Sequence, residues 1–250
     1  MFTVIETMDA RYIWSGVIWA IVMGLAVGNY ACSLIHRLPR GRLLLDKKPY
    51  CGSCGALLQV RDLFPVISAV LLRHRCRYCG TSYPTSHTVT ELLLASIFVF
   101  AFLKYDFSDM AILTITLSAF LIILAAIEVN EKIIMGKVII CTIIVGMLLR
   151  VYTDGVLFNF VLGGLFATVI GAVVWRKSIE KVGHIYRLPK QAEIMAMAGI
   201  CVGAKLFPLF LLLFIGFTFA IWLYAKISSG VFYITIPLGL AIMSTIFYAS

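Results

Sequence analysis

Four cysteines, arranged as two pairs, are the residues of this 250-residue chain whose spacing most clearly predicts chemistry. The pairs are Cys51-Gly-Ser-Cys54 and Cys76-Arg-Tyr-Cys79, with 21 residues between them. Two such pairs at this spacing are typical of a tetrahedral Zn²⁺ site in which four thiolates bind one ion. The tight turns of such a site are permitted by Gly52, Gly55 and Gly80.

The rest of the chain has the composition of a membrane protein. It is 62% hydrophobic and 13% charged, with a mean hydropathy of +1.01, whereas a soluble domain contains about 25% charged residues. Too few polar side chains remain to cover a surface in water. This excludes a soluble domain, a disordered chain, a disulfide scaffold and a soluble nucleic-acid binder, and it predicts an all-α polytopic protein in contact with membrane lipid.

Eight apolar stretches predict about eight transmembrane helices, several of them short enough to require tilt or local thinning of the bilayer. They cover residues 13–35, 89–104, 110–127, 138–152, 156–175, 192–206, 208–225 and 231–249. A polar, basic insert at 36–88 separates the first span from the second. The predicted organisation is a first span at 1–35, a zinc-binding insert at 36–88 and a seven-span domain at 89–250.

The distribution of basic residues predicts the orientation of these spans. If the N-terminus lies outside, the segments inside carry 17 of the 21 Lys and Arg residues. The four outside are Arg11, Lys104, Arg150 and Lys205. Cytoplasmic loops hold the excess of positive charge, so both termini are expected on the far side of the membrane from the insert.

Disulfides and a redox Cys-x-x-Cys motif are the alternatives to a metal site. The insert is predicted to lie in the cytoplasm, where thiols stay reduced, and a redox motif needs one pair of cysteines rather than two. The insert is also too small to fold on an apolar core alone, so a bound metal would supply folding free energy. A structural zinc site is therefore the favoured interpretation.

The sequence resembles the type IV prepilin peptidases, which are aspartic proteases of the bacterial inner membrane. The resemblance begins at residues 28–41, which contain Arg37-Leu38-Pro39, and continues through the two cysteine pairs with Phe64-Pro65 between them. Tyr83-Pro84 and Glu91-Leu92-Leu93 then lead into the second span. The chain length, the eight spans and the position of the insert agree with this family as well.

Membership would imply an activity and its partners. Enzymes of this family cut the short basic leader from type IV prepilin or pseudopilin precursors at the cytoplasmic face. Many also methylate the new N-terminus with S-adenosylmethionine. The resemblance further implies a multi-pass protein of the bacterial inner membrane, in which the orientation predicted from the basic residues places both termini in the periplasm.

The family's two catalytic aspartates are not found at their expected positions. Glu128 stands at the first position, and the glycine spacing that includes Gly199 and Gly203 places Gln191 at the second. A slip of two residues would place Glu193 there instead. Three explanations stay open: Glu128 and Glu193 replace the pair of aspartates; the chain is an inactive member, since a glutamine cannot titrate; or the register of this assignment is wrong, although the remaining acids offer no better pair. Without the resemblance, Glu128 would be interpreted as a solvated loop charge beside Lys132, and Glu193 as a charge that suits the dipole at a helix N-terminus.

Two further functions stay open at this level. A catalytically inactive relative could bind precursors during assembly of a pilus or secretion system without cutting them. A small membrane transporter is the alternative from another class, although the chain has almost no ionisable residue within its spans and no matching broken helices.

Overall fold

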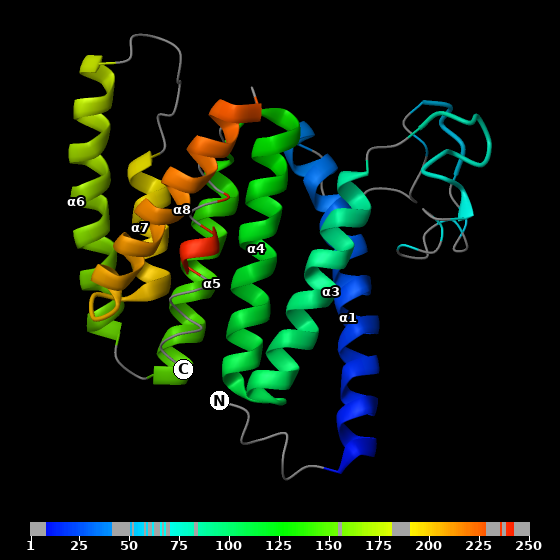
Figure 1. The fold of residues 1–250 in the computed structure, drawn as a ribbon, viewed down its shortest axis with the longest axis horizontal. Helices are drawn as coiled ribbons and strands as arrows, with labels where there is room; N and C mark the ends of the chain where they lie inside the picture. The colour runs from blue at the N-terminus through cyan, green and yellow to red at the C-terminus, as the bar shows by residue number, and fades with distance from the viewer. Residues whose placement is uncertain are drawn as a thin grey trace. The chain divides into compact units, whose positions relative to one another are not determined.

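The structure is a computed structural model in which every named element is a helix (Figure 1). It describes residues 9–41, 51, 53–57, 59, 62, 66, 68, 71–82, 85–154, 157–181, 191–228, 236 and 239–242. The elements are α1 (Ala10–Arg37), the 3₁₀-helix η2 (Leu38–Arg40), α3 (Ser86–Tyr105), α4 (Asp109–Glu131), α5 (Gly136–Asp154), α6 (Leu157–Lys181), α7 (Gln191–Val202) and α8 (Phe207–Ser228). The predicted all-α class is confirmed. Most of the predicted span at 231–249 lies outside the described residues, although 239–242 are helical.

Within the described residues, three helices are long and apolar enough to cross a membrane. They cover Ala10–Arg40, Ser86–Tyr105 and Asp109–Glu131, and shorter apolar helices cover Gly136–Leu149, Phe158–Ile170 and Phe207–Ala220. Large apolar side chains such as Trp14, Trp19 and Phe219 are more than half exposed. Such a surface suits lipid rather than water, so this is a membrane protein.

The chain forms two compact units, of which the first covers residues 1–115. In this unit α1 packs closely along α3 (Figure 1). Helix α1 has buried glycines at Gly16, Gly24 and Gly28, which are separated by eight and four residues and therefore lie on the same face of the helix. A Cβ atom built on Gly24 would lie 2.5 Å from the Cα atom of Ala95, and one on Gly28 would lie 2.7 Å from the Cα atom of Glu91. Only glycine allows so close an approach of two backbones.

The second unit covers residues 116–250, and a similar glycine contact joins α6 to α7 within it. A Cβ atom on Gly163 would lie 2.5 Å from the carbonyl oxygen of Gly199. Helix α7 ends at Val202 because Gly203 adopts a left-handed conformation with φ +82°. The helix is therefore shorter than the predicted span at 192–206. The backbone amides of Ala204 and Lys205 donate to the backbone and side-chain oxygens of Asn159, respectively, at the start of α6.

Candidate functional site

The two cysteine pairs adopt the same local geometry. In the first, the Cys51 amide donates to the Ala56 carbonyl, and the Gly55 amide donates to the Cys51 carbonyl, both at 2.9 Å. In the second, the Cys76 amide donates to the Thr81 carbonyl, and the Gly80 amide donates to the Cys76 carbonyl, again both at 2.9 Å. Gly55 and Gly80 both have φ +72°, a value that other residues rarely adopt. Each pair is thus a tight turn that directs its two thiols to one side.

The two turns bring all four thiols together. The sulfur atoms of Cys51, Cys54, Cys76 and Cys79 lie within 4.8 Å of one another, and those of Cys51 and Cys79 are 3.9 Å apart. In a tetrahedral site with Zn–S bonds of about 2.3 Å, two sulfurs lie about 3.8 Å apart. All four cysteines are free thiols. This cluster could therefore bind a metal such as zinc, and its soft donors suit that ion.

Hydrogen bonds from the turns favour the charged form of two of these thiols. The backbone amides of Cys54 and Ser53 lower the pKa of Cys51. The hydroxyl of Thr81, 3.3 Å from Cys79 Sγ, and the Thr81 amide lower the pKa of Cys79 to about 6. A metal binds the thiolate and not the thiol, so both shifts prepare the site for an ion.

Cys54 shows the opposite shift. Its bond to the Ala56 amide lowers the pKa, but desolvation and the neighbouring sulfurs of Cys79 and Cys51 outweigh this effect and raise it to about 11. Because the thiolates of Cys51 and Cys79 form first, Cys54 has to ionise beside existing negative charge. A bound divalent cation would remove that penalty.

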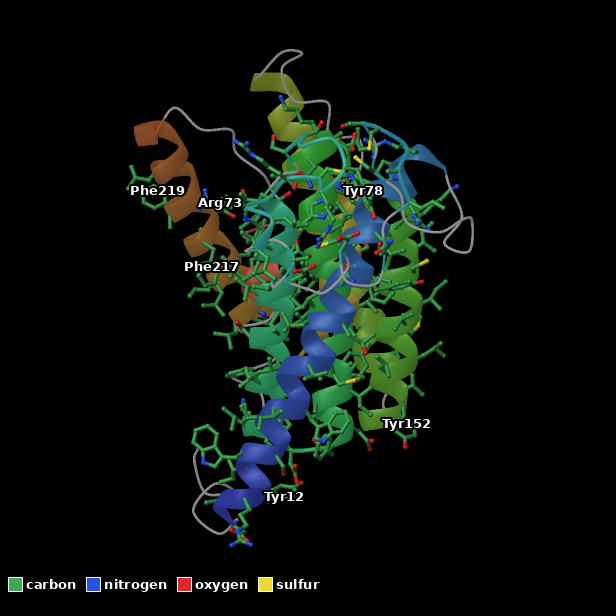
Figure 2. All side chains as sticks on the ribbon, turned by 90° about the vertical axis from the view of Figure 1, so that its right-hand side faces the viewer. Tyr12, Arg73, Tyr78, Tyr152, Phe217 and Phe219 are labelled. Carbon is green, nitrogen blue, oxygen red and sulfur yellow. The ribbon has the colours of Figure 1, made fainter. Side chains whose placement is uncertain are left out.

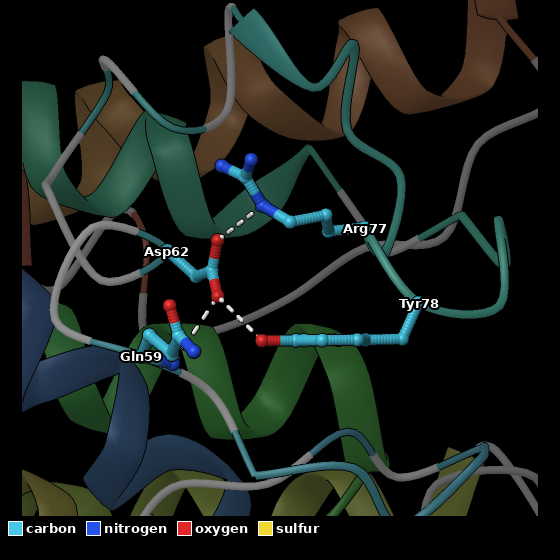
Figure 3. Close-up of polar contacts among 4 residues, drawn as sticks. All are labelled: Gln59, Asp62, Arg77 and Tyr78. Atoms are coloured by element: carbon cyan, nitrogen blue, oxygen red, sulfur yellow. Dashed lines mark hydrogen bonds and ion pairs between the residues drawn. The ribbon is translucent and has the colours of Figure 1, made fainter.

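A buried aspartate holds the second turn in place (Figure 3). The side chain of Asp62 is only 3% exposed, and its Oδ1 accepts from Arg77 Nε at 2.7 Å. Its Oδ2 accepts from the Gln59 amide at 3.1 Å and from the Tyr78 hydroxyl at 3.5 Å. Arg77 and Tyr78 are the two residues between Cys76 and Cys79, so this carboxylate fixes the backbone that carries both thiols. Sequence reasoning assigned no role to Asp62; its signal is that only two acids, Asp46 and Asp62, occur in a basic insert.

The insert lies at one end of the pair α1 and α3. Figure 2 shows Arg73 and Tyr78 of the insert towards the end of the unit opposite to Tyr12, which lies in the first turn of α1. At the insert end, the Val66 amide donates to Glu91 Oε2 of α3 at 2.8 Å. The insert that carries the candidate metal centre is thus hydrogen-bonded to a helix that is long and apolar enough to span a membrane.

The candidate catalytic residues belong to the second unit. Glu128 lies one turn before the end of α4 and is only 6% exposed. The Lys132 amide donates to the Glu128 carbonyl at 2.9 Å, and Lys132 has φ +54°, which ends the helix. Gln191 is the first residue of α7. The side chains of Gln191 and Glu193 lie outside the described residues, so the predicted pairing with Glu128 stays a prediction.

Comparison with known proteins identifies relatives along most of the chain. Residues 22–105, which contain the insert, match the family model of the bacterial peptidase A24 N-terminal domain. A prepilin leader peptidase/N-methyltransferase of Vibrio cholerae is 26% identical over 89% of this chain and 91% of its own length. One of Klebsiella pneumoniae is 26% identical over 81% of this chain and 91% of its own length.

A third relative with the same name matches a shorter part of the chain. The prepilin leader peptidase/N-methyltransferase of Myxococcus xanthus is 26% identical over 46% of this chain, and the matched part spans 34% of that relative. No solved structure matches the chain. The family model covers the second half of α1, the insert in which the four thiols converge, and α3. The match to the Vibrio relative covers 89% of the chain. The chain is therefore similar to prepilin leader peptidase/N-methyltransferases over most of its length.

Proposed function

We propose that this protein is a membrane-embedded leader peptidase that cleaves the basic leader of type IV prepilin or pseudopilin precursors at the cytoplasmic face. The observation that carries the proposal is the match to a prepilin leader peptidase/N-methyltransferase over 89% of the chain. The names of several relatives also include methyl transfer to nitrogen. The proposal therefore extends to methylation of the new N-terminus, for which S-adenosylmethionine would be the methyl donor.

The proposed topology has eight spans in the bacterial inner membrane. A first span at 1–35 precedes the insert at 36–88, and seven spans follow in an aspartic-protease-like domain at 89–250. Both termini face the periplasm, because the segments assigned to the cytoplasm hold 17 of 21 basic residues. In this arrangement a substrate would approach from the side of the insert.

We assign a structural Zn²⁺ ion to Cys51, Cys54, Cys76 and Cys79. The convergence of four thiols from two equivalent turns supports this assignment. A bound ion would cross-link the two turns and supply the folding free energy that a small insert lacks. The ion is expected to affect catalysis only indirectly, by keeping the insert folded.

Glu128 is the proposed first catalytic carboxyl. Ionisable residues that are buried at the end of an apolar helix are costly, and in membrane proteins they usually serve a function. In peptide hydrolysis by two carboxyls, one ionised group removes a proton from water, while the other, protonated, donates a hydrogen bond to the scissile carbonyl and later a proton to the leaving amine. Glu193 is the proposed second catalytic carboxyl in an active enzyme. If Gln191 occupies that position instead, the site contains only one titratable group, because a glutamine cannot titrate.

Cleavage of a purified prepilin by the reconstituted protein tests this proposal. Glu128→Gln should abolish shortening of the precursor, while Glu131→Gln, three residues further along the same helix, should retain it. If the unmodified protein does not cut, Glu128→Asp combined with Gln191→Asp should restore cutting, and neither change alone should. A folded double variant that binds the precursor without shortening it would favour a precursor-binding protein and contradict the enzyme.

A further inference from the structure

Two histidines meet where the insert joins the helix pair. His36 lies in the last turn of α1 and His87 in the first turn of α3, and their Nε2 atoms are 2.6 Å apart. The ring centroids are 4.7 Å apart, with an angle of 32° between the ring planes. Because the centroids are further apart than the nitrogens, the rings do not stack face to face but meet nitrogen to nitrogen.

The hydrogen bond between the two Nε2 atoms can contain only one proton. A neutral imidazole has one N–H donor and one acceptor nitrogen, whereas a protonated ring has two donors and no acceptor. A hydrogen bond between two facing Nε2 atoms therefore needs one of them to lack a proton. When both rings are imidazolium ions, both Nε2 atoms are donors and two positive charges face each other, so the contact cannot persist.

Other polar groups surround the pair on each element. On α1, Cys32 Sγ donates to the His87 carbonyl at 3.4 Å, and Arg40 Nη1 of η2 donates to the His36 carbonyl at 2.6 Å. Arg37 follows His36 directly. On α3, Glu91 lies one turn beyond His87, with its carboxylate bonded to the Val66 amide. The insert contributes a third histidine, His74, which interacts electrostatically with His87.

The first two turns of α3 contain both the residue that contacts His36 and the residue that binds the backbone of the insert. His87 contacts the end of α1, and Glu91, four residues later, accepts from the backbone of the insert. Gly28 of α1 packs tightly against the backbone of Glu91, since a Cβ atom on Gly28 would lie 2.7 Å from the Cα atom of Glu91. Separation of the two rings would therefore disturb the position at which the insert is attached.

We propose that His36 and His87 form a proton-sharing contact that anchors the insert and opens when both rings are protonated. In the closed form one proton lies between the facing nitrogens and at most one ring is an imidazolium ion. The contact opens when the second ring is also protonated, so opening of the singly charged pair takes up one proton as the pH falls. The equilibrium constant for opening should rise about tenfold per pH unit in the range where this proton is taken up. The proposal does not depend on peptidase activity.

Hydrogen exchange of the full-length protein in lipid nanodiscs between pH 7.5 and 5.5 tests the proposal. After correction for the intrinsic pH dependence of amide exchange, the Val66 amide should lose protection as the pH falls. His36→Gln and His87→Gln should each abolish this pH dependence, because a single histidine cannot form the pair. His184→Gln, the matched control, should behave as the unmodified protein does. Zinc content is measured at every pH, so that release of metal is distinguished from opening.

Ring ¹⁵N NMR provides a second readout that does not rely on the stability of the variants. The two rings should take up protons in two separate steps, and substitution of either ring should leave the other with a single ordinary step. Independent titration of both rings in the unmodified protein would overturn the proposal. So would unchanged pH dependence of exchange in both glutamine variants, or ring signals showing that a metal ion bridges the nitrogens at every pH.

Discussion

At the scale of single residues, the candidate metal centre depends on groups that do not touch the metal. The carboxylate of Asp62 contacts the two residues between Cys76 and Cys79, and Gly55 and Gly80 provide the left-handed turns beside the thiols. Outer groups of this kind orient the ligands, and their loss usually weakens metal binding. The four cysteines alone therefore do not determine the affinity of the site.

Asp62→Asn should lower the affinity for zinc by about tenfold, the lower end of the range for residues that support metal ligands. The amide cannot balance the charge of Arg77, so the second turn becomes less ordered. Competition with a chromogenic chelator measures the affinity in the full-length protein. Asp109→Asn, at the start of α4, is the matched control and should leave it unchanged. An Asp62→Asn protein with unaltered affinity would show that the carboxylate does not support the metal turn.

Gly80→Ala should destabilise the insert by roughly 1–2 kcal/mol, the cost of a left-handed conformation for a residue with a side chain. A Cβ atom at this position would have no other atom within 4 Å, so backbone strain is the only expected cause. Gly216→Ala in α8 also meets empty space but has ordinary helical geometry. It should be neutral or slightly stabilising. Retention of zinc during titration with urea measures both variants, and equal retention would contradict the argument from strain.

At the scale of helices, close packing between α1 and α3 depends on glycine. The glycines at positions 24 and 28 of α1 allow backbone contact with Ala95 and Glu91. In lipid, where burial of apolar surface does not drive helix association, such packing is a principal source of stability. Any larger side chain at these positions has to push the helices apart.

Gly24→Leu should therefore separate α1 from α3 and lower the thermal stability of the protein by several degrees. Val22→Leu, on the exposed side of the same helix, adds volume without a clash and is the matched control. Disulfide cross-linking between cysteines introduced on facing positions of the two helices reports the packing directly. Efficient cross-linking in the Gly24→Leu protein would show that the helices accommodate the side chain.

The helices were largely predictable from the sequence, but their contacts were not. Predicted spans at 110–127 and 138–152 correspond to α4 (Asp109–Glu131) and α5 (Gly136–Asp154), because long apolar runs define helices in a membrane. The end of α7 was placed too late, since nothing local distinguishes Gly203 from the other glycines until its backbone conformation is known.

Contacts between distant residues required the structure. The spacing of the cysteines predicted which four would converge, because a metal site constrains ligand spacing. No comparable rule connects His36 to His87 or Asp62 to Arg77, which pair through the tertiary fold. The repeated small residues of α1 were a usable signal for close helix packing, since glycine at intervals of four residues is typical of it.

At the scale of the whole molecule, the distribution of charge predicts the orientation in the membrane. A protease site inserted after residue 180 should be cut only from the cytoplasm, and one after residue 106 only from the periplasm, because 17 of 21 basic residues fall in the segments assigned to the cytoplasm. Proteolysis of spheroplasts and of inverted vesicles measures accessibility from each side. Reversed accessibility at either position would contradict the span assignment and the proposed location of the site.

Because α1 and α3 pack along their length and meet at His36 and His87, the chain leaves one helix and enters the next at almost the same place. A connection whose ends are neighbours can change in length without moving the elements that it joins, since each doubling of a flexible loop costs only about 0.6 kcal/mol. The insert is thus a natural position for the exchange of one small domain for another. Homologues with shorter or longer modules at this position, and chimeras built at this junction, should keep the same helical hairpin.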